Sequence, residues 1–219
     1  MSSKDYIYCY QGSALRVAGG TAVIGKNYDK YNPLGLGYGT MRLKFAQGYT
    51  PTVGNVSNVL VDAEENIWDC TSSAAGQPSL PNLAYNKYLL ECISANLRRS
   101  TGTGFVTGLS WKFQGCSNLV SVSLPCTDHV TDMSRMFFNC TSLTSCPLLD
   151  TSSCTNMSSM FEGCVNIQSG SLDLYQQAST QATPPSLYTD TFKDCGRDTV
   201  TGAAELAQIP TSWGGTMAE

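Results

Sequence analysis

Hydrophobic residues recur in one pattern through the second half of the chain. The two clearest copies run Val130-Thr-Asp-Met133-Ser-Arg-Met136-Phe137-Phe-Asn-Cys140 and Cys154-Thr-Asn-Met157-Ser-Ser-Met160-Phe161-Glu-Gly-Cys164. In both copies the apolar residues follow each other at steps of three, three, one and three, which places them along one side of a short helix. Threonine near the start of each copy favours a helix N-terminus, because its hydroxyl can accept from free backbone amides. We therefore predict a short helix in each copy, with the methionines and phenylalanines in the core.

Four cysteines mark the copies of this motif. Each follows a phenylalanine by three residues, and successive ones are 24, 24 and 31 residues apart: Cys116, Cys140, Cys164 and Cys195. A motif that returns at a step of about 20 to 50 residues indicates a repeat architecture. Upstream, residues 83–93 predict a degenerate first copy, with Leu89 in the phenylalanine position and Cys92 in the cysteine position.

A brief strand is predicted after each helix. The segment Leu119-Val-Ser-Val-Ser-Leu124-Pro125 is extended in character and ends at a proline, as does Leu143-Thr-Ser-Cys146-Pro147. One helix, turn and strand cannot bury its own apolar face, so neighbouring units are expected to stack and share a core. Trp213, near the C-terminus, is expected to cover the last unit.

The first eighty residues carry a pattern of period two instead. Tyr6-Ile-Tyr-Cys-Tyr10 and Met41-Arg-Leu-Lys-Phe45 alternate, and a shorter stretch lies near Val59-Leu-Val61. These segments predict short strands. The predicted fold class is therefore an α/β solenoid of short strand plus short helix units, preceded by a small β-rich head. The predicted domains are residues 1–80 for the head and 81–219 for the repeats with their C-terminal cap.

Composition narrows the classes of function. The chain has 219 residues, 42% of them hydrophobic, which is ample for a folded core. With 13 Lys and Arg against 17 Asp and Glu, it lacks the basic surface that nucleic-acid binding requires. No apolar run approaches the roughly 18 to 20 residues that cross a bilayer. We expect no nucleic acid partner and no membrane insertion.

Reactive groups are sparse in the sequence. His129 is the only histidine, and the cysteines lack the close pairs of zinc sites, so we expect no metal and no cofactor. His129 lies near Asp128 and Cys126, but the interpretation as a solvated loop histidine is favoured over a catalytic base. The framework cysteines are interpreted as small buried core residues.

Two further clusters are given structural interpretations. The glycines Gly35, Gly37 and Gly39 do not match a phosphate-binding fingerprint and are interpreted as turn residues. Asp62, Glu64 and Glu65 are interpreted as a surface cluster, because no second acid stands in a cleft-forming relation to them.

The sequence Val130-Thr-Asp-Met-Ser-Arg-Met-Phe-x-x-Cys-Thr-Ser-Leu143, followed by Pro147-Leu-Leu-Asp-Thr-Ser152, resembles the BspA-like leucine-rich repeats. It is most similar to the methionine- and cysteine-rich variety of gut bacteria and their phages or prophages. The resemblance covers about residues 83–213. It implies a right-handed, leucine-rich-repeat-like solenoid. It also implies recognition or attachment rather than catalysis.

The predicted binding site is the exposed side of the sheet that the short strands would form. Alternation along those strands leaves four hydroxyl residues on that side: Ser121, Ser123, Thr144 and Ser145. A shallow surface of this kind is suited to a protein or a surface glycan. An oligomer formed through the N-terminal head is left open.

The function expected from these features is non-enzymatic recognition, attachment or assembly. The first residues lack the apolar region of a secretory signal, which favours a phage or prophage virion protein from a tail, fibre or head accessory. Such a protein would bind another protein or a host surface molecule, and would lie in the virion or, before release, in the host cytoplasm. Two alternatives stay open: a BspA-like bacterial adhesin at the cell surface or outside the cell, and a glycan-acting enzyme.

Overall fold

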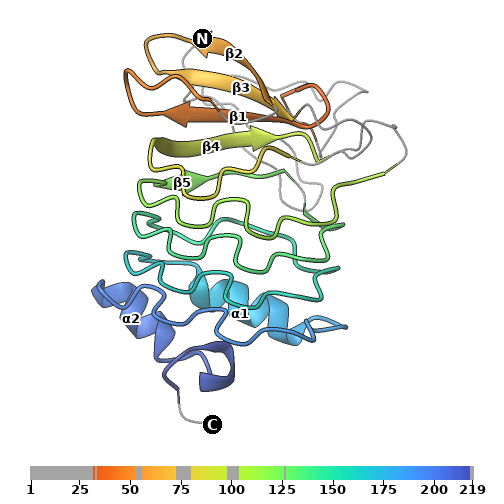
Figure 1. Cartoon of the computed structure of the whole chain (residues 1–219). Helices are drawn as coiled ribbons and strands as arrows, with labels where there is room; N and C mark the ends of the chain where they lie inside the picture. Colours follow the sequence, from red (N-terminus) through yellow and green to blue (C-terminus); the bar gives the residue numbers. More distant parts are fainter. Residues whose placement is uncertain are drawn as a thin grey trace, which may run out of the picture.

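A mixed five-stranded sheet forms one end of the molecule, and two short helices lie at the other end (Figure 1). The computed structural model describes residues 32, 34–52, 56–72, 80–97, 104–125 and 127–217. The strands are β1 (Thr40–Phe45), β2 (Val56–Asp62), β3 (Ile67–Ser72), β4 (Leu89–Ala95) and β5 (Ser121–Val122), in the order β2-β3-β1-β4-β5. Neighbouring strands pair antiparallel except β4 and β5, which are parallel.

The predicted strand at residues 41–45 is confirmed as part of β1. Met41, Leu43 and Phe45 are buried, whereas Arg42 and Lys44 lie on the other side of the sheet. The stretch at residues 59–61 lies in β2 as predicted, and the segment at residues 6–10 lies outside the described residues. Because β1 pairs with β4, the sheet crosses residue 80, and the division into domains 1–80 and 81–219 stays a prediction.

The predicted fold class, an α/β solenoid of strand plus helix units, is wrong. The described residues form a single mixed sheet and only two short α-helices, α1 (Ser171–Thr180) and α2 (Val200–Leu206), with a 3-10 turn at Thr211–Trp213. Residues 130–140 and 154–164, where helices were predicted, fold as consecutive turns. In the described part of the chain, neither helix is long and apolar enough to cross a bilayer.

Left-handed residues explain why the repeated motif does not form helices. Arg135 and Asn139 have φ of 51° and 57°, a conformation that a right-handed helix cannot contain. The Phe137 amide donates to the carbonyl of Met160 in the next copy at 2.9 Å, instead of to its own chain four residues back. The Cys140 amide donates three residues back, to Phe137, also at 2.9 Å. Successive turns therefore produce the same three-residue apolar spacing as a helix.

The motif phenylalanines form the centre of the core. Ring centroids are 5.5 Å apart between Phe113 and Phe137, 5.1 Å between Phe137 and Phe161, and 6.0 Å between Phe161 and Phe192. Trp213 continues this series at 6.5 Å from Phe192, so the contact predicted for Trp213 at the last copy is confirmed. The predicted burial of the motif methionines is also confirmed for Met133, Met136, Met157 and Met160.

The predicted burial of the framework cysteines is confirmed as well. Each of three thiols donates to a carbonyl of the preceding copy: Cys140 to Phe113 at 3.0 Å, Cys164 to Phe137 at 2.9 Å, and Cys116 to Leu83 at 3.0 Å. Leu83, and not Leu89, therefore takes the phenylalanine position of the first copy. Leu89 instead begins β4, and Cys92 pairs with Val122 of β5. Cys92 lies 24 residues before Cys116, as a motif cysteine would, but it belongs to a strand, and this coincidence explains the wrong assignment of Leu89.

Hydrogen bonds to Glu205 connect α2 with the start of α1. Its carboxylate accepts from the amides of Gly170, Ser171 and Leu172 and from the Ser171 hydroxyl, at 2.6 to 3.3 Å. Burial acts to raise the pKa of Glu205, but these donors outweigh it and the pKa is lowered.

We expect Glu205→Gln to lower the free energy of unfolding by about 1 kcal/mol at neutral pH, after allowance for solvent screening. A lowered carboxyl pKa contributes stability that is present above its ordinary value of 4.5 and is lost as the pH falls through the folded-state value. The deficit of the variant should therefore shrink in acid. Urea unfolding of both proteins at neutral and acidic pH measures this, and an equal deficit at both would contradict it.

Candidate binding face

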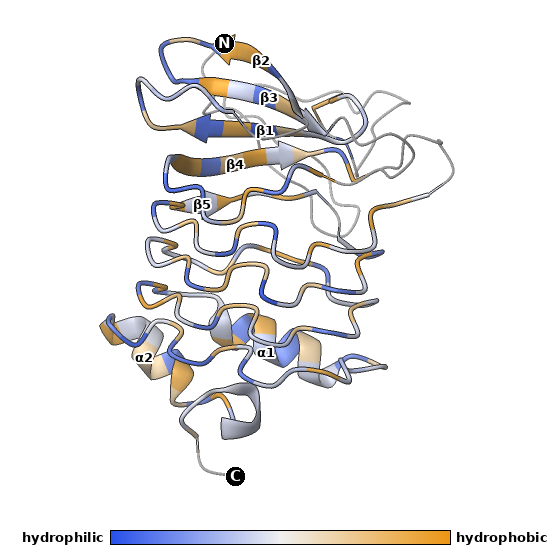
Figure 2. Cartoon of the chain, viewed as in Figure 1, coloured by the Kyte–Doolittle hydropathy of each residue, from blue (hydrophilic) through white to orange (hydrophobic). Residues whose placement is uncertain are grey.

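Charged side chains line the outer side of the sheet. Hydrophilic and hydrophobic colours alternate along β1 (Figure 2), and this alternation directs Arg42 and Lys44 to the side opposite the core. Arg42 lies opposite Asp69 of β3 and forms a two-pronged ion pair with it, at 2.7 and 2.8 Å. Lys44 lies opposite Glu91 of β4, with their charged atoms 3.8 Å apart, and it also binds Glu65.

The charge of Lys44 is held fixed by its neighbours. The hydrogen bond with Glu65 raises the pKa of Lys44 above its ordinary value, burial opposes this, and the Glu91 carboxylate adds to the rise. The amine therefore stays protonated at neutral pH. A protonated amine is neither a general base nor a nucleophile, so Lys44 offers a fixed positive charge to a ligand.

A hollow of about 440 Å³ opens on this side of the sheet. Its lining combines charged, hydroxyl and aliphatic side chains from the sheet and the adjoining loops: Leu34, Arg42, Lys44, Val61, Asp62, Glu65, Ile67, Glu91, Cys92, Ile93, Ser121, Val122 and Ser123. The lining is thus amphipathic, and within it Lys44 is paired with both Glu65 and Glu91. We call the hollow together with the exposed hydroxyls beyond β5 the sheet face.

The structure brings two of the four predicted site residues to this hollow. Ser121 is exposed on β5 opposite Glu91, and Ser123 is half-buried with its amide bound to the Cys92 carbonyl at 2.8 Å. Thr144 and Ser145 are exposed but do not line the hollow. The Thr144 amide donates to the Val120 carbonyl at 3.4 Å, just before β5, and Ser145 forms an isolated parallel bridge with Ser169 of the following copy. The two hydroxyls therefore extend the exposed surface from β5 toward the next copies.

Sequence reasoning missed the charged half of the face. Arg42 and Lys44 are the polar members of the alternation that predicted β1, so their side of the strand was readable. Their partners Asp69 and Glu91 were not, because the pairing depends on the order β3-β1-β4 and joins residues far apart in sequence. Asp62, interpreted as part of a surface cluster, lies in the lining and accepts from the amides of Glu64 and Glu65.

The remaining sequence candidates lie elsewhere. His129 is half-buried against the ring of Phe105, with centroids 4.0 Å apart, and does not line the hollow. Gly35 and Gly39 have positive φ of 64° and 68°, in agreement with the turn interpretation. Within the described ranges, no three His, Cys, Asp or Glu side chains are grouped so that they could hold a metal ion.

Comparison with known proteins gives one family match. Residues 107–185 match the family model described as Mycoplasma protein of unknown function, DUF285, a family associated with BspA-like repeat proteins. The matched region contains three copies of the motif and α1. No curated protein and no solved structure matches the chain.

Proposed function

We propose that this chain is a non-enzymatic recognition and attachment protein related to the BspA-like proteins. In this proposal it is a phage or prophage virion component, from a tail, fibre or head accessory, and the sheet face binds a host surface molecule or another protein. The observation that supports the proposal most strongly is the sheet face itself. It combines exposed hydroxyls at Ser121, Thr144 and Ser145 with a charged hollow.

The chemistry of this face favours binding over reaction. Hydroxyls donate and accept, so they can bind the hydroxyls of a glycan or the backbone of a protein. The ion pairs of Arg42 and Lys44 add fixed charges of both signs, which give an interface its specificity more than its affinity. The described cysteines are buried and their pKa values are raised, which keeps them thiols at neutral pH.

Mass spectrometry of purified virions tests the virion assignment. Virions would be released from the bacterium that carries the gene and purified by density gradient. We expect peptides of this chain at a constant ratio to the major capsid protein across the virion peak. Peptides found only in the cell-envelope fraction would favour the adhesin instead, and would overturn the virion proposal.

Substitution of the sheet face tests the binding surface. We expect Ser121→Arg with Thr144→Arg to weaken binding of the labelled protein to host cells by at least about tenfold, because bulky charges prevent close contact and desolvation. The matched control is Gln176→Arg with Val200→Arg, which adds the same charge at exposed positions of α1 and α2. Equal binding by wild type, control and double variant would exclude this face, provided all three give the same thermal unfolding curve.

A further inference from the structure

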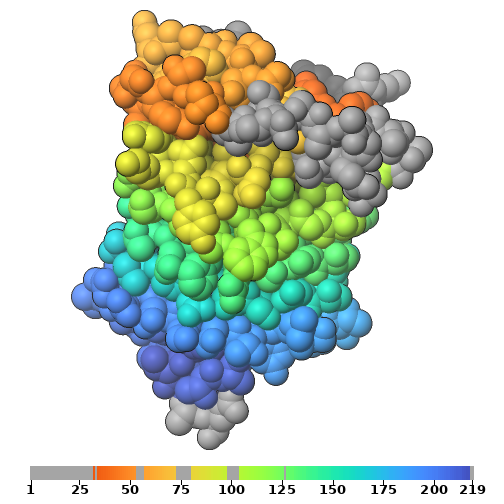
Figure 3. All heavy atoms as spheres, viewed as in Figure 1, coloured from red at the N-terminus to blue at the C-terminus, as the bar shows by residue number. Residues whose placement is uncertain are grey.

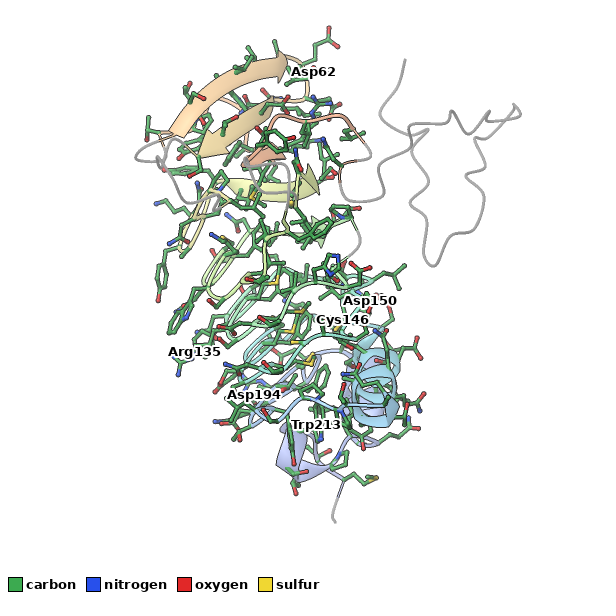
Figure 4. All side chains as sticks on the ribbon, turned by 90° about the vertical axis from the view of Figure 1, so that its right-hand side faces the viewer. Asp62, Arg135, Cys146, Asp150, Asp194 and Trp213 are labelled. Carbon is green, nitrogen blue, oxygen red and sulfur yellow. The ribbon has the colours of Figure 1, made fainter. Side chains whose placement is uncertain are left out.

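A second surface presents exposed aromatic rings on one edge of the molecule. Tyr85, Tyr88 and Trp111 are 69%, 41% and 43% exposed. Arg135, which packs on Trp111, marks this edge in Figure 4, on the side away from Cys146 and Asp150. Figure 3 views the molecule from this edge, with the segments around residues 80–90 and 110–115 near its centre in yellow and yellow-green. We call this surface the aromatic edge.

The rings are held in place by specific contacts. The Tyr85 hydroxyl accepts from the Gln114 amide at 2.5 Å, and its ring lies on Gly115, where an added Cβ would come within 2.5 Å of it. Tyr88 stacks on Tyr49 with centroids 4.3 Å apart and planes at 14°. Rings fixed in this way lose little conformational entropy when a ligand covers them.

Backbone strain accompanies two of these rings. Tyr85 and Trp111 have φ of 62° and 64°, a region that bulky residues rarely adopt and that costs of order 1 kcal/mol or more each. The same conformation recurs at the matching position of the next copy, at Arg135 for Trp111 and at Gly115 for Tyr85, so it belongs to the repeated turn. The repeated turn therefore fixes the backbone at both positions and holds the two rings at the surface.

Two cations lie against the rings. The Arg135 guanidinium is 4.7 Å from the centroid of Trp111, and the Lys87 ammonium is 5.3 Å from that of Tyr88. Among the described residues neither cation forms an ion pair, whereas Lys193 and Arg197, further along the chain, each bind two carboxylates. The aromatic edge therefore carries positive charge that is available to a ligand, on a chain whose net charge is −4.

A shallow hollow of about 390 Å³ lies beside Tyr85, Tyr88 and Lys87. Asn82, Asn86, Thr52 and Lys87 supply amide, hydroxyl and ammonium groups to its lining, beside the rings of Tyr49, Tyr85 and Tyr88. The site thus offers exposed aromatic rings, hydrogen-bonding groups beside them and two cations that form no ion pair with any described residue.

We propose that the aromatic edge binds an acidic saccharide. The C–H bonds of a pyranose face are weakly positive and pack on the negative face of an aromatic ring, while the amides bind ring hydroxyls. Carboxylates of the saccharide pair with Lys87 and Arg135. This site is distinct from the sheet face and does not depend on it. Its ligand class follows from the rings and the unpaired cations alone.

Calorimetric titration tests the proposal with three acidic probes: trigalacturonate, trimannuronate and sialyllactose. Galactotriose and lactose are the neutral controls. We expect the full chain to bind at least one acidic probe, more weakly as salt increases, and to bind the neutral sugars at least about tenfold more weakly. Absence of binding to all three acidic probes, or equal binding of the neutral sugars, would overturn the proposal.

Variants locate the site. Trp111→Ala and the double variant Lys87→Gln with Arg135→Gln should each weaken binding of the acidic probe by at least about fivefold. Lys193→Gln, which removes a cation already paired with carboxylates, should leave it unchanged, as should Ser121→Arg with Thr144→Arg on the sheet face. If the aromatic-edge variants bind as well as wild type, the saccharide site is elsewhere. All variants replace exposed or half-buried side chains, and near-UV circular dichroism verifies that each is folded.

Discussion

Raising the pH from about 8 to about 10 is expected to unfold this protein. The cause is its set of buried thiols, eight of which lie among the described residues: Cys70, Cys92, Cys116, Cys140, Cys146, Cys154, Cys164 and Cys195. Burial raises the pKa of Cys116 to about 12 and that of Cys154 to about 11, from an ordinary value of 9.0. The pKa values of the other six are raised as well.

The sign of the effect follows from proton binding. Above pH 9.0 the unfolded chain releases its thiol protons, whereas the folded chain retains them, so the free energy of unfolding falls as the pH rises. One pH unit above the unfolded value, each thiol has cost about 1.4 kcal/mol, or about 11 kcal/mol for eight. A domain of this kind has about 5–15 kcal/mol in total. Lys112 opposes the trend, because burial lowers its pKa, but it is one group against eight.

Far-UV circular dichroism along a pH titration under reducing conditions measures this transition, with return to neutral pH as the test of reversibility. Cys140→Ala provides the matched control, since it removes one buried thiol. Relative to wild type, its free energy of unfolding should improve by about 1.4 kcal/mol between about pH 8 and pH 10. A native spectrum retained well above pH 10, or an unchanged pH dependence in the variant, would show that the thiols do not govern alkaline stability.

The sequence predicted what is buried better than it predicted the backbone conformation. Phe137, Met136 and Cys140 were assigned to the core because apolar residues spaced by three share one side of a helix, and they share one side of a series of turns as well. The choice between the two depends on Arg135 and Asn139. Asparagine tolerates the left-handed region, but arginine has no preference for it, so the sequence does not indicate a positive φ at Arg135.

The candidate sites also have a part that local sequence patterns indicate and a part that depends on contacts distant in sequence. Alternation is local, so it located the outward side of Ser121 on β5, and the same signal along β1 was sufficient to place Arg42, although it was not used to do so. The hollow between them exists only because β4 lies beside both strands, and that order is set by contacts distant in sequence. The aromatic edge was missed for a related reason. Trp111 occupies the same turn position as Arg135 one copy later, and their contact becomes visible only when the copies lie side by side.

Phe137→Ala is expected to lower the free energy of unfolding by about 3–5 kcal/mol. The ring is fully buried between Phe113 and Phe161, so truncation removes apolar burial, leaves a cavity and breaks two stacked contacts. Each aromatic contact adds about 0.5–1.5 kcal/mol beyond its buried area. Neighbouring copies are joined by backbone hydrogen bonds on either side of this ring, which limits collapse into the cavity. Urea unfolding of the variant and wild type measures the loss.

The adjacent residue supplies the control. Phe138 has the same side chain but is half-buried on the aromatic edge beside Arg135, so Phe138→Ala should cost about 1 kcal/mol. Because the Cys164 thiol donates to the Phe137 carbonyl, loosening this copy should also expose that thiol, and its reaction with a disulfide reagent should accelerate in Phe137→Ala but not in Phe138→Ala. Equal losses of stability and equal labelling rates in the two variants would mean that the phenylalanine series is not the centre of the core. In that case the backbone hydrogen bonds between copies would carry the stability that is assigned here to the rings.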